Sequence, residues 1–103
     1  MRGSSTGRPV MAALDLLGRR WTLRVLWELR DGPLGARAIL GRCPGLSSSV
    51  LYERLRELTA SDLLERAGDD YALTTIGASL RTALQPLDAW ANKWAGEAPP
   101  PGH

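Results

Sequence analysis

The chain has 103 residues, of which 44% are hydrophobic and 23% charged, a composition typical of one folded domain rather than a disordered chain. Thirteen basic and eleven acidic residues leave a formal net charge of +2, too small for a protein that coats nucleic acid by charge alone. The apolar runs are short and interrupted by charge. No membrane span or signal peptide is therefore predicted, and we expect a cytoplasmic protein.

The residue types needed for catalysis or metal binding are scarce. The sequence holds one cysteine, Cys43, and one histidine, His103, which is the last residue. An internal disulfide is excluded, and no set of metal ligands is predicted. The serines have no internal histidine to activate them, and no glycine-rich phosphate loop is found. We therefore predict neither an enzyme nor a bound cofactor.

Both ends of the chain are rich in glycine, serine or proline. We predict a flexible N-terminal arm over residues 1–8, a folded domain over 9–95 and a disordered C-terminal tail over 96–103. Pro9 suits the first turn of a helix of about nine residues, whose apolar positions keep helical spacing until Gly18.

The next two predicted helices are separated by turn signals. The segment Arg19–Arg30 is apolar on more than one face, so it is expected to be the central buried helix, and Asp31-Gly32-Pro33 ends it. A weaker helix is predicted over Gly35–Arg42, and Cys43-Pro44-Gly45 then forces a sharp turn.

Ser47 is a good N-cap for the clearest helix of the chain, predicted over Ser48–Ala60, with Leu51, Leu55 and Leu58 on one face. Two short apolar runs follow, Leu63–Arg66 and Tyr71–Leu73. They flank Gly68-Asp69-Asp70 and predict a tight β-hairpin.

The last predicted helix begins after a cap at Thr74 or Thr75, and Pro86 is expected to kink or break it near Gln85. A short helix, a sharp turn and a capped helix form the helix-turn-helix plan, and a hairpin directly afterwards makes it winged. The predicted fold is mainly α: a winged helix-turn-helix with a short two-stranded β-hairpin wing.

Several short motifs stand in a fixed order along the chain: Pro9-Val10, LDLLGRRW (14–21), VLWEL (25–29), DGP (31–33), PGLS (44–47), LYERLREL (51–58) and LTTIG (73–77). In these motifs the chain from Arg8 to Trp94 resembles the HxlR family of winged-helix transcriptional regulators, relatives of the MarR group. The resemblance implies a DNA-binding homodimer. It also implies that the first and last helices supply most of the dimer contact and that the helix over 48–60 enters the major groove.

The sequence departs from this family at three places. Arg8 stands where many members carry a redox-sensing cysteine, so we expect a bound small-molecule effector rather than thiol sensing. Only Ala67-Gly68-Asp69-Asp70 separates the two predicted strands, and its acidic tip would be repelled by phosphate. An aromatic residue common in the family is missing near Gly35-Ala36.

The candidate DNA-reading residues lie on the predicted helix 48–60, opposite its leucines. Arg56 can form two hydrogen bonds to guanine, and Glu53 can accept one from cytosine. The remaining candidates are Tyr52 at the edge of this face and, at the helix N-terminus, Ser47, Ser48 and Ser49. Alternatively, the face is simply solvated, with Glu53, Arg56 and Glu57 pairing their charges at helical spacing.

Charge is unevenly distributed along the domain. Residues 19–42 hold six arginines and two acidic residues, so the second and third helices are candidates for phosphate contacts, with Arg37 facing outward. The resemblance implies that Arg20 lies near phosphate. Residues 53–70 hold three arginines and six acidic residues, so we expect modest, salt-dependent affinity. The net negative charge of residues 53–70 motivates a rival hypothesis. In it, the protein is a winged-helix module that has lost DNA binding and binds a protein or an aromatic ligand.

Four tryptophans are unusual in a chain without phenylalanine. Trp21 and Trp27 fall on the second predicted helix, and Trp90 and Trp94 on the last. Packing in the core or at a dimer interface is the first interpretation. The alternative is a flat aromatic effector held between the helices of the dimer.

Cys43 also has two interpretations. It is either a small apolar residue of the turn, or a thiol whose ionised form is favoured by Arg42 and the following helix N-terminus, open to an intermolecular disulfide. The sequence as a whole predicts a transcriptional regulator with double-stranded DNA, a second copy of itself and a small effector as partners.

Overall fold

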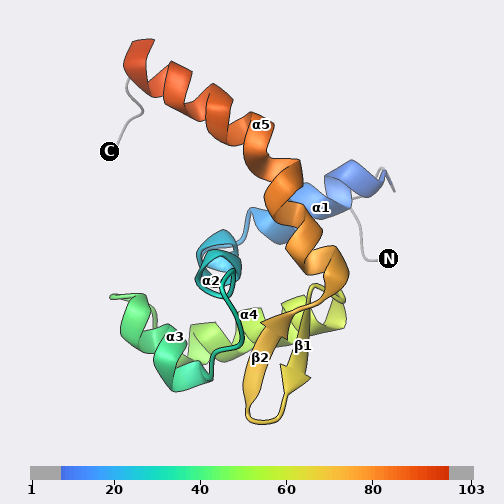
Figure 1. Ribbon diagram of the computed structural model, residues 1–103, viewed down its shortest axis with the longest axis vertical. Coiled ribbons are helices and arrows are strands. Elements are labelled where there is room, and N and C mark those ends of the chain that lie inside the picture. The colour runs from blue at the N-terminus through green and yellow to red at the C-terminus, as the bar shows by residue number, and fades with distance from the viewer. Residues whose placement is uncertain (1–7, 98–103) are drawn as a thin grey trace.

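The computed structural model describes residues 8–97, so most of the predicted arm and tail lies outside the described residues. Within that range the chain forms four helices, then a β-hairpin and then a long last helix (Figure 1). Their bounds are α1 Pro9–Leu17, α2 Thr22–Glu28, α3 Ala36–Arg42, α4 Ser48–Ala60, β1 Leu64–Ala67, β2 Asp70–Leu73 and α5 Thr75–Glu97. The predicted winged helix-turn-helix fold is confirmed.

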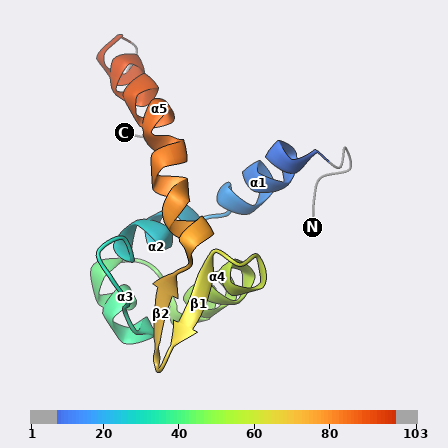
Figure 2. The same ribbon diagram turned by 45° about the vertical axis from the view of Figure 1, so that its right-hand side comes forward.

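Helix α1 has the predicted length and ends at Gly18. It projects away from the rest of the domain (Figure 2). Ala12 is buried, but the apolar side chains of Val10 and Leu14 are 53% and 58% exposed. The apolar stripe of α1 is therefore largely uncovered in a single chain.

Helix α2 is shorter than predicted. The prediction of a helix over Arg19–Arg30 was wrong at both ends, because α2 covers only Thr22–Glu28. Trp21 adopts a left-handed backbone conformation with φ 74°, which the helical pattern could not reveal and which places the two preceding arginines in a turn. At the other end Leu29 leaves the helical conformation, with ψ 4°.

The elements from α3 to the wing follow the prediction closely. Helix α3 begins one residue later than expected, at Ala36, and α4 has the predicted bounds. The strands pair antiparallel; β1 is shifted by one residue from the predicted range and β2 begins one residue earlier than predicted, so Ala67 pairs with Asp70. The turn thus consists of Gly68 and Asp69, and Gly68 takes a positive φ of 64° that glycine adopts without strain.

A backbone bridge joins the wing to the loop before α3, a contact that the sequence did not predict. The amide of Leu34 donates to the carbonyl oxygen of Tyr71 at 3.0 Å, and the amide of Tyr71 donates back at 2.8 Å. One bridged residue in a loop leaves no periodic signal, so it could not be recognised from sequence. It anchors the wing to the body of the domain.

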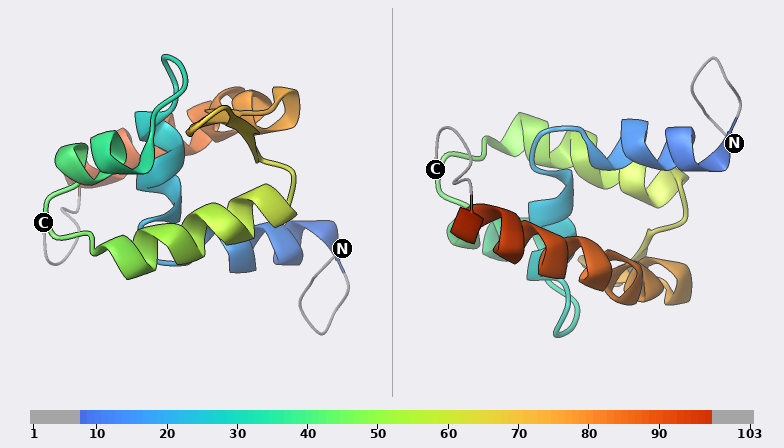
Figure 3. Two further views of the ribbon diagram at one scale, coloured as in Figure 1. Left: turned by 90° about the horizontal axis from the view of Figure 1, so that it is seen from below. Right: turned by 90° about the horizontal axis from the view of Figure 1, so that it is seen from above.

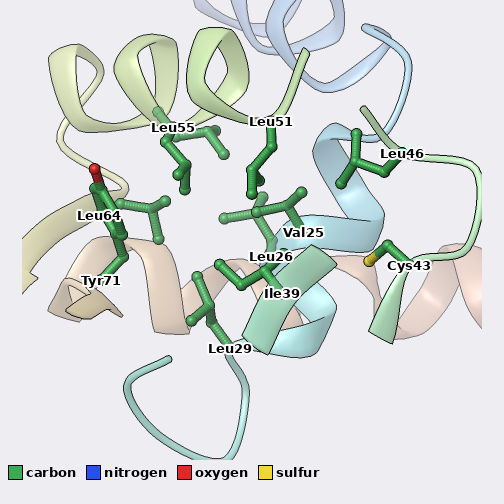
Figure 4. Packing of buried hydrophobic residues seen from close by; sticks show 11 residues of the cluster. Val25, Leu26, Leu29, Ile39, Cys43, Leu46, Leu51, Leu55, Leu64 and Tyr71 are labelled. Atoms are coloured by element: carbon green, nitrogen blue, oxygen red, sulfur yellow. The ribbon is translucent and has the colours of Figure 1, made fainter. Parts of the chain in front are cut away.

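The core lies between α2, α3, α4 and the wing (Figure 4). Its fully buried members include the three leucines predicted on one face of α4, Leu51, Leu55 and Leu58. Val25 and Ile39 contribute from α2 and α3, and both are 0% exposed. Helix α2 thus lies in the core by the face that carries Val25 and Leu26 and supports α4 from behind, whereas its second apolar face, with Leu23 and Trp27, is exposed rather than buried as predicted.

Helix α5 runs without a break from Thr75 to Glu97, so of the predicted kink or break near Gln85 the break does not occur. Pro86 and Thr82 are both exposed, and water can hydrogen-bond to the carbonyl group that loses its helical partner. Gly96 and Glu97, which were assigned to the tail, belong to this helix. Of the two predicted caps, Thr74 is the one used, since its Oγ1 accepts from the amide of Gly77 at 3.0 Å.

Candidate nucleic-acid interface

Helices α3 and α4 and the turn between them form the helix-turn-helix. Seen from below, α3 lies beside the N-terminal half of α4 (Figure 3). Gly45 turns the chain with a φ of 93°, a conformation natural to glycine. Ser47 caps α4 as predicted, because its hydroxyl accepts from the amide of Val50 at 3.2 Å. The hydroxyl oxygens of Ser47 and Ser49 lie 3.3 Å apart.

The face of α4 opposite the core carries the predicted DNA-reading residues together. Ser48, Ser49, Tyr52, Glu53 and Arg56 are all exposed, with Tyr52 51% exposed. Arg56 makes no hydrogen bond or ion pair within residues 8–97, so its guanidinium is available to a ligand. Glu53 pairs with Arg54 at 3.4 Å rather than with Arg56.

Arg54 is a functional residue that the sequence analysis missed. Its Nε donates to the carbonyl oxygen of Arg20 at 2.8 Å, and its Nη1 donates to Glu57 at 2.9 Å. Glu57 also lies 3.8 Å from Arg19. The Arg54 side chain is only 12% exposed, and the signal was its spacing, because it stands three residues after Leu51 on the buried side of the helix. Arg54 fixes α4 to the turn before α2.

The remaining arginines divide into engaged and available groups. Arg24 pairs with Glu28 at 2.8 Å and donates to the carbonyl oxygen of Arg42 at 2.7 Å. Arg42 itself lies 3.8 Å from Glu28. The side chains of Arg20 and Arg37, the two predicted phosphate contacts, are exposed and make no interaction within residues 8–97.

The one arginine of the wing is held by the wing itself. Arg66 stacks over the ring of Tyr71 at 4.6 Å and donates to its hydroxyl at 2.8 Å. It also donates to the carbonyl oxygen of Gly68 at 3.4 Å. Asp69 at the tip is exposed. The wing therefore presents an acidic tip while its cation is already engaged.

The four tryptophans do not form one site within a single chain. Trp21 packs partly buried against the core, near Gly45. Trp27 is 50% exposed, with Arg30 stacked over its ring at 3.9 Å. Trp90 and Trp94 stack on each other on α5, with ring centroids 5.4 Å apart. Of the four, only Trp27 lines the groove between α2 and α5.

Cys43 is not the accessible thiolate that one interpretation of the sequence allowed. Its side chain is 1% exposed and packs in the core. Burial raises the pKa of the Cys43 thiol, and the lowering by nearby Arg24 is the smaller effect. The apolar interpretation therefore describes this residue, and an intermolecular disulfide through it would require the core to open.

Comparison with known proteins agrees with this geometry. A family model described as HxlR-like helix-turn-helix matches residues 16–99, which is most of the chain. The chain belongs to the HxlR-like helix-turn-helix family. It is 33% identical over 90 residues to the HTH-type transcriptional regulator YodB of Bacillus subtilis, and the match covers 81% of this chain and 80% of YodB.

Solved structures of HxlR and MarR regulators share the fold. The quinone-bound YodB of B. subtilis superimposes with a TM-score of 0.76 at 37% identity, covering 79% of this chain and 92% of that one. A transcriptional regulator of the MarR family from Enterococcus faecalis V583 gives a TM-score of 0.79 at 25% identity, covering 93% and 96%. The protein is thus a DNA-binding transcriptional regulator of the helix-turn-helix type, and its relatives are regulators rather than enzymes.

None of the helices between residues 8 and 97 is both long and apolar enough to cross a membrane. In the same range, no three histidine, cysteine, aspartate or glutamate side chains are grouped so as to hold a metal ion.

Proposed function

We propose that the protein binds a pseudo-palindromic operator as a homodimer, with α4 of each copy in one of two successive major grooves. The observation that carries this proposal is the exposed face of α4, on which Arg56 has no partner within residues 8–97. In such a dimer the two α4 helices lie about 34 Å apart, one turn of the duplex.

The residues of this interface divide between reading bases and holding phosphates. Arg56 and Glu53 reach base edges in the major groove, with Ser49 and Tyr52 beside them. Ser47 and Ser48 stand at the N-terminus of α4, where amide groups and the helix dipole favour phosphate oxygens. Arg20 and Arg37 bind the backbone of the duplex. The wing, with its acidic tip and its engaged arginine, is assigned no DNA contact.

The dimer contact is formed by α1 and the outer half of α5. Val10 and Leu14 on α1, and Leu87 and Trp90 on α5, are each more than half exposed in the single chain. Both helices project from the body of the domain (Figure 2). Apolar side chains gathered on projecting helices are typical of faces that a second copy covers.

A small-molecule effector controls occupancy of the operator. One relative, YodB, has been crystallised with a quinone bound, which supports control by a small organic molecule in this chain as well. The family position for a sensing cysteine holds Arg8 here, and Cys43 is buried. Non-covalent binding is therefore the proposed input.

The test is an anisotropy titration of the purified protein on DNA flanking its own gene and on a scrambled duplex, at two salt concentrations. We expect the flanking DNA to bind at least tenfold more tightly, which corresponds to about 1.4 kcal/mol. Weak, equal binding to both duplexes that vanishes as salt rises would overturn the proposal and favour the module that has lost DNA binding.

A second measurement separates the dimer from the DNA contact. Sedimentation equilibrium is expected to give a dimer for the wild-type chain and a monomer for Leu14→Asp, because a carboxylate at the centre of the α1 face cannot be buried without a partner. Ala38→Asp, an exposed change on α3 away from both helices, serves as the charged control. A wild-type monomer at the concentrations that bind DNA would contradict the homodimer.

A further inference from the structure

Helix α5 crosses α2 (Figure 3). Side chains of both helices line a groove of about 620 Å³. It is open to solvent on one side and lies on the opposite side of α2 from the core beneath α4. Its lining comes from α2 and Arg30 just after it, from Leu73 at the end of β2, and from α5 between Gly77 and Asp88. None of the residues assigned above to DNA contact belongs to it.

The walls of the groove are mostly apolar. Leu23 and Trp27 contribute from α2 and are 41% and 50% exposed, although both are large apolar side chains. Leu80 and Leu84 face them from α5 and are half-buried. Apolar surface left in contact with water gains free energy when a ligand covers it. The volume lies within the range usual for small-molecule sites.

The rim of the groove carries an arginine without a partner. Three arginines line the groove, and two of them are engaged, Arg24 with Glu28 and Arg30 with the ring of Trp27. Arg81 makes no hydrogen bond, ion pair or ring contact within residues 8–97. Asp88, the one carboxylate of the lining, follows it by seven residues on α5, about 10 Å along the axis. The groove therefore has an excess of positive charge beside apolar walls.

We propose that this groove binds a small organic anion, a molecule with a flat apolar body and one carboxylate. The apolar body lies against Trp27, Leu80 and Leu84. The carboxylate accepts two hydrogen bonds from the guanidinium of Arg81, a geometry in which arginine binds carboxylates most strongly. This site deepens the effector part of the proposed function and gives the effector a chemical class.

A second copy of α1 is the competing occupant, and the exposed apolar side chains on the outer half of α5 give it another surface to pack on. Leu87 and Trp90, exposed apolar side chains on the outer half of α5, are not among the residues that line the groove. The apolar faces of α1 and the outer half of α5 remain available to each other in the dimer. The groove is thus left to a smaller molecule.

The groove is joined to the helix-turn-helix through one side chain. Arg24 lines the groove, and its Nη2 donates to the carbonyl oxygen of Arg42, the last residue of α3, at 2.7 Å. A ligand that draws the Arg24 guanidinium into the groove breaks this bond and loosens the end of α3. This regulatory consequence rests on the proposed function, whereas binding of the anion does not.

The test is isothermal titration calorimetry of the full chain without DNA, using 2-naphthoate as the probe and its neutral analogue 2-naphthylmethanol. We expect saturable binding of 2-naphthoate, at least tenfold tighter than the neutral analogue. Arg81→Gln is expected to weaken 2-naphthoate at least tenfold and leave the neutral analogue within twofold. Lys93→Gln removes the same charge from the same helix outside the groove, and it is expected to change neither.

Several results would overturn the site. The first is that 2-naphthoate shows no saturable binding at millimolar concentration. The second is that the charged and neutral probes bind with equal affinity. The third is that Arg81→Gln and Lys93→Gln change the affinity for 2-naphthoate equally. Release of monomer by 2-naphthoate in sedimentation would assign the groove to the second copy instead. The operator titration above is run in parallel: failure there with a positive calorimetric result rejects the proposed function and keeps the site, and the reverse pattern rejects the site alone.

Discussion

The guanidinium of Arg54 on α4 donates to the main-chain carbonyl oxygen of Arg20, 34 residues earlier in the chain, at 2.8 Å. The accepting residue directly precedes Trp21, whose backbone is left-handed. Because the acceptor is a main-chain atom, no substitution of the Arg20 side chain removes this bond. The orientation of α4, the helix proposed to read DNA, is thus fixed in part by a largely buried side chain of its own, independently of the arginines proposed to face the duplex.

Replacing Arg54 is expected to lower stability as well as DNA binding. Arg54→Met leaves the Arg20 carbonyl and the half-buried Glu57 without their donor, and we expect a loss of about 2 kcal/mol in the free energy of unfolding. Urea denaturation measures it. Arg56→Met, two residues along and exposed, is the control and is expected to leave stability unchanged. Equal unfolding midpoints for both variants would contradict a positioning role.

The two kinds of arginine at the interface predict different effects on specificity. Arg56→Ala is expected to weaken operator binding by about tenfold or more and to weaken scrambled DNA much less, since it removes a contact to a base. Arg20→Ala is expected to weaken both duplexes alike and to reduce the salt dependence of binding. Parallel anisotropy titrations decide the matter, and an equal loss on both duplexes for Arg56→Ala would remove its base-reading role.

Gly77 at the start of α5 has no room for a side chain. A Cβ there would lie 2.1 Å from the carbonyl oxygen of Leu63, a main-chain atom that cannot rotate away. Gly77→Ala is expected to destabilise the protein by about 1–3 kcal/mol. Gly96→Ala on the same helix has open space and is expected to be neutral or slightly stabilising. Thermal unfolding of the pair provides the comparison; similar melting temperatures would refute the close approach.

Thr22 is fully buried, and its hydroxyl has no hydrogen-bond partner within the described residues. Thr22→Val keeps the shape and removes the unsatisfied polar atom, so we expect a gain of up to about 1 kcal/mol in the free energy of unfolding. Thr22→Ser keeps the hydroxyl but removes a methyl group from the core, so a loss is expected. A destabilised Thr22→Val would reveal a partner, such as a buried water, for this hydroxyl.

Burial of Cys43 predicts a specific pH dependence. Because burial raises the pKa of the thiol in the folded chain, the folded state holds its proton to a higher pH than the unfolded state does. The contribution to stability is therefore complete below the ordinary thiol pKa and is lost as pH rises through the folded value. We expect Cys43→Ala to show a smaller alkaline loss of stability than wild type. Rapid reaction of the native thiol with a disulfide reagent at pH 8 would argue against this burial.

The elements best predicted from sequence were those with a local signal. Ser47 and the leucines of α4 specify a capped amphipathic helix, and its bounds were correct. The start of α2 was predicted wrongly because the backbone of Trp21 is left-handed, a conformation imposed by packing rather than by local preference. Pro86 was expected to kink or break α5, and the break does not occur, since an exposed helix tolerates the lost hydrogen bond.

At the candidate site, the exposed face of α4 could be derived from helical geometry alone. The role of Arg54 could not, because its partner is a backbone atom in a distant turn. The groove beside Trp27 was equally hidden, since it depends on where α5 crosses α2 and on Arg81, which carries no recognisable motif. In general, contacts between segments far apart in the chain could not be predicted from the sequence.

Helix α5 passes uninterrupted from the body of the domain to the proposed dimer face, a span of about 34 Å for its 23 residues. Each residue added or removed in the middle of this rod turns its outer end by about 100° relative to the body. In the proposed dimer, the relative position of the two α4 helices along the duplex therefore depends on the number of residues in α5. Evolution can retune half-site spacing there without altering one residue that touches DNA.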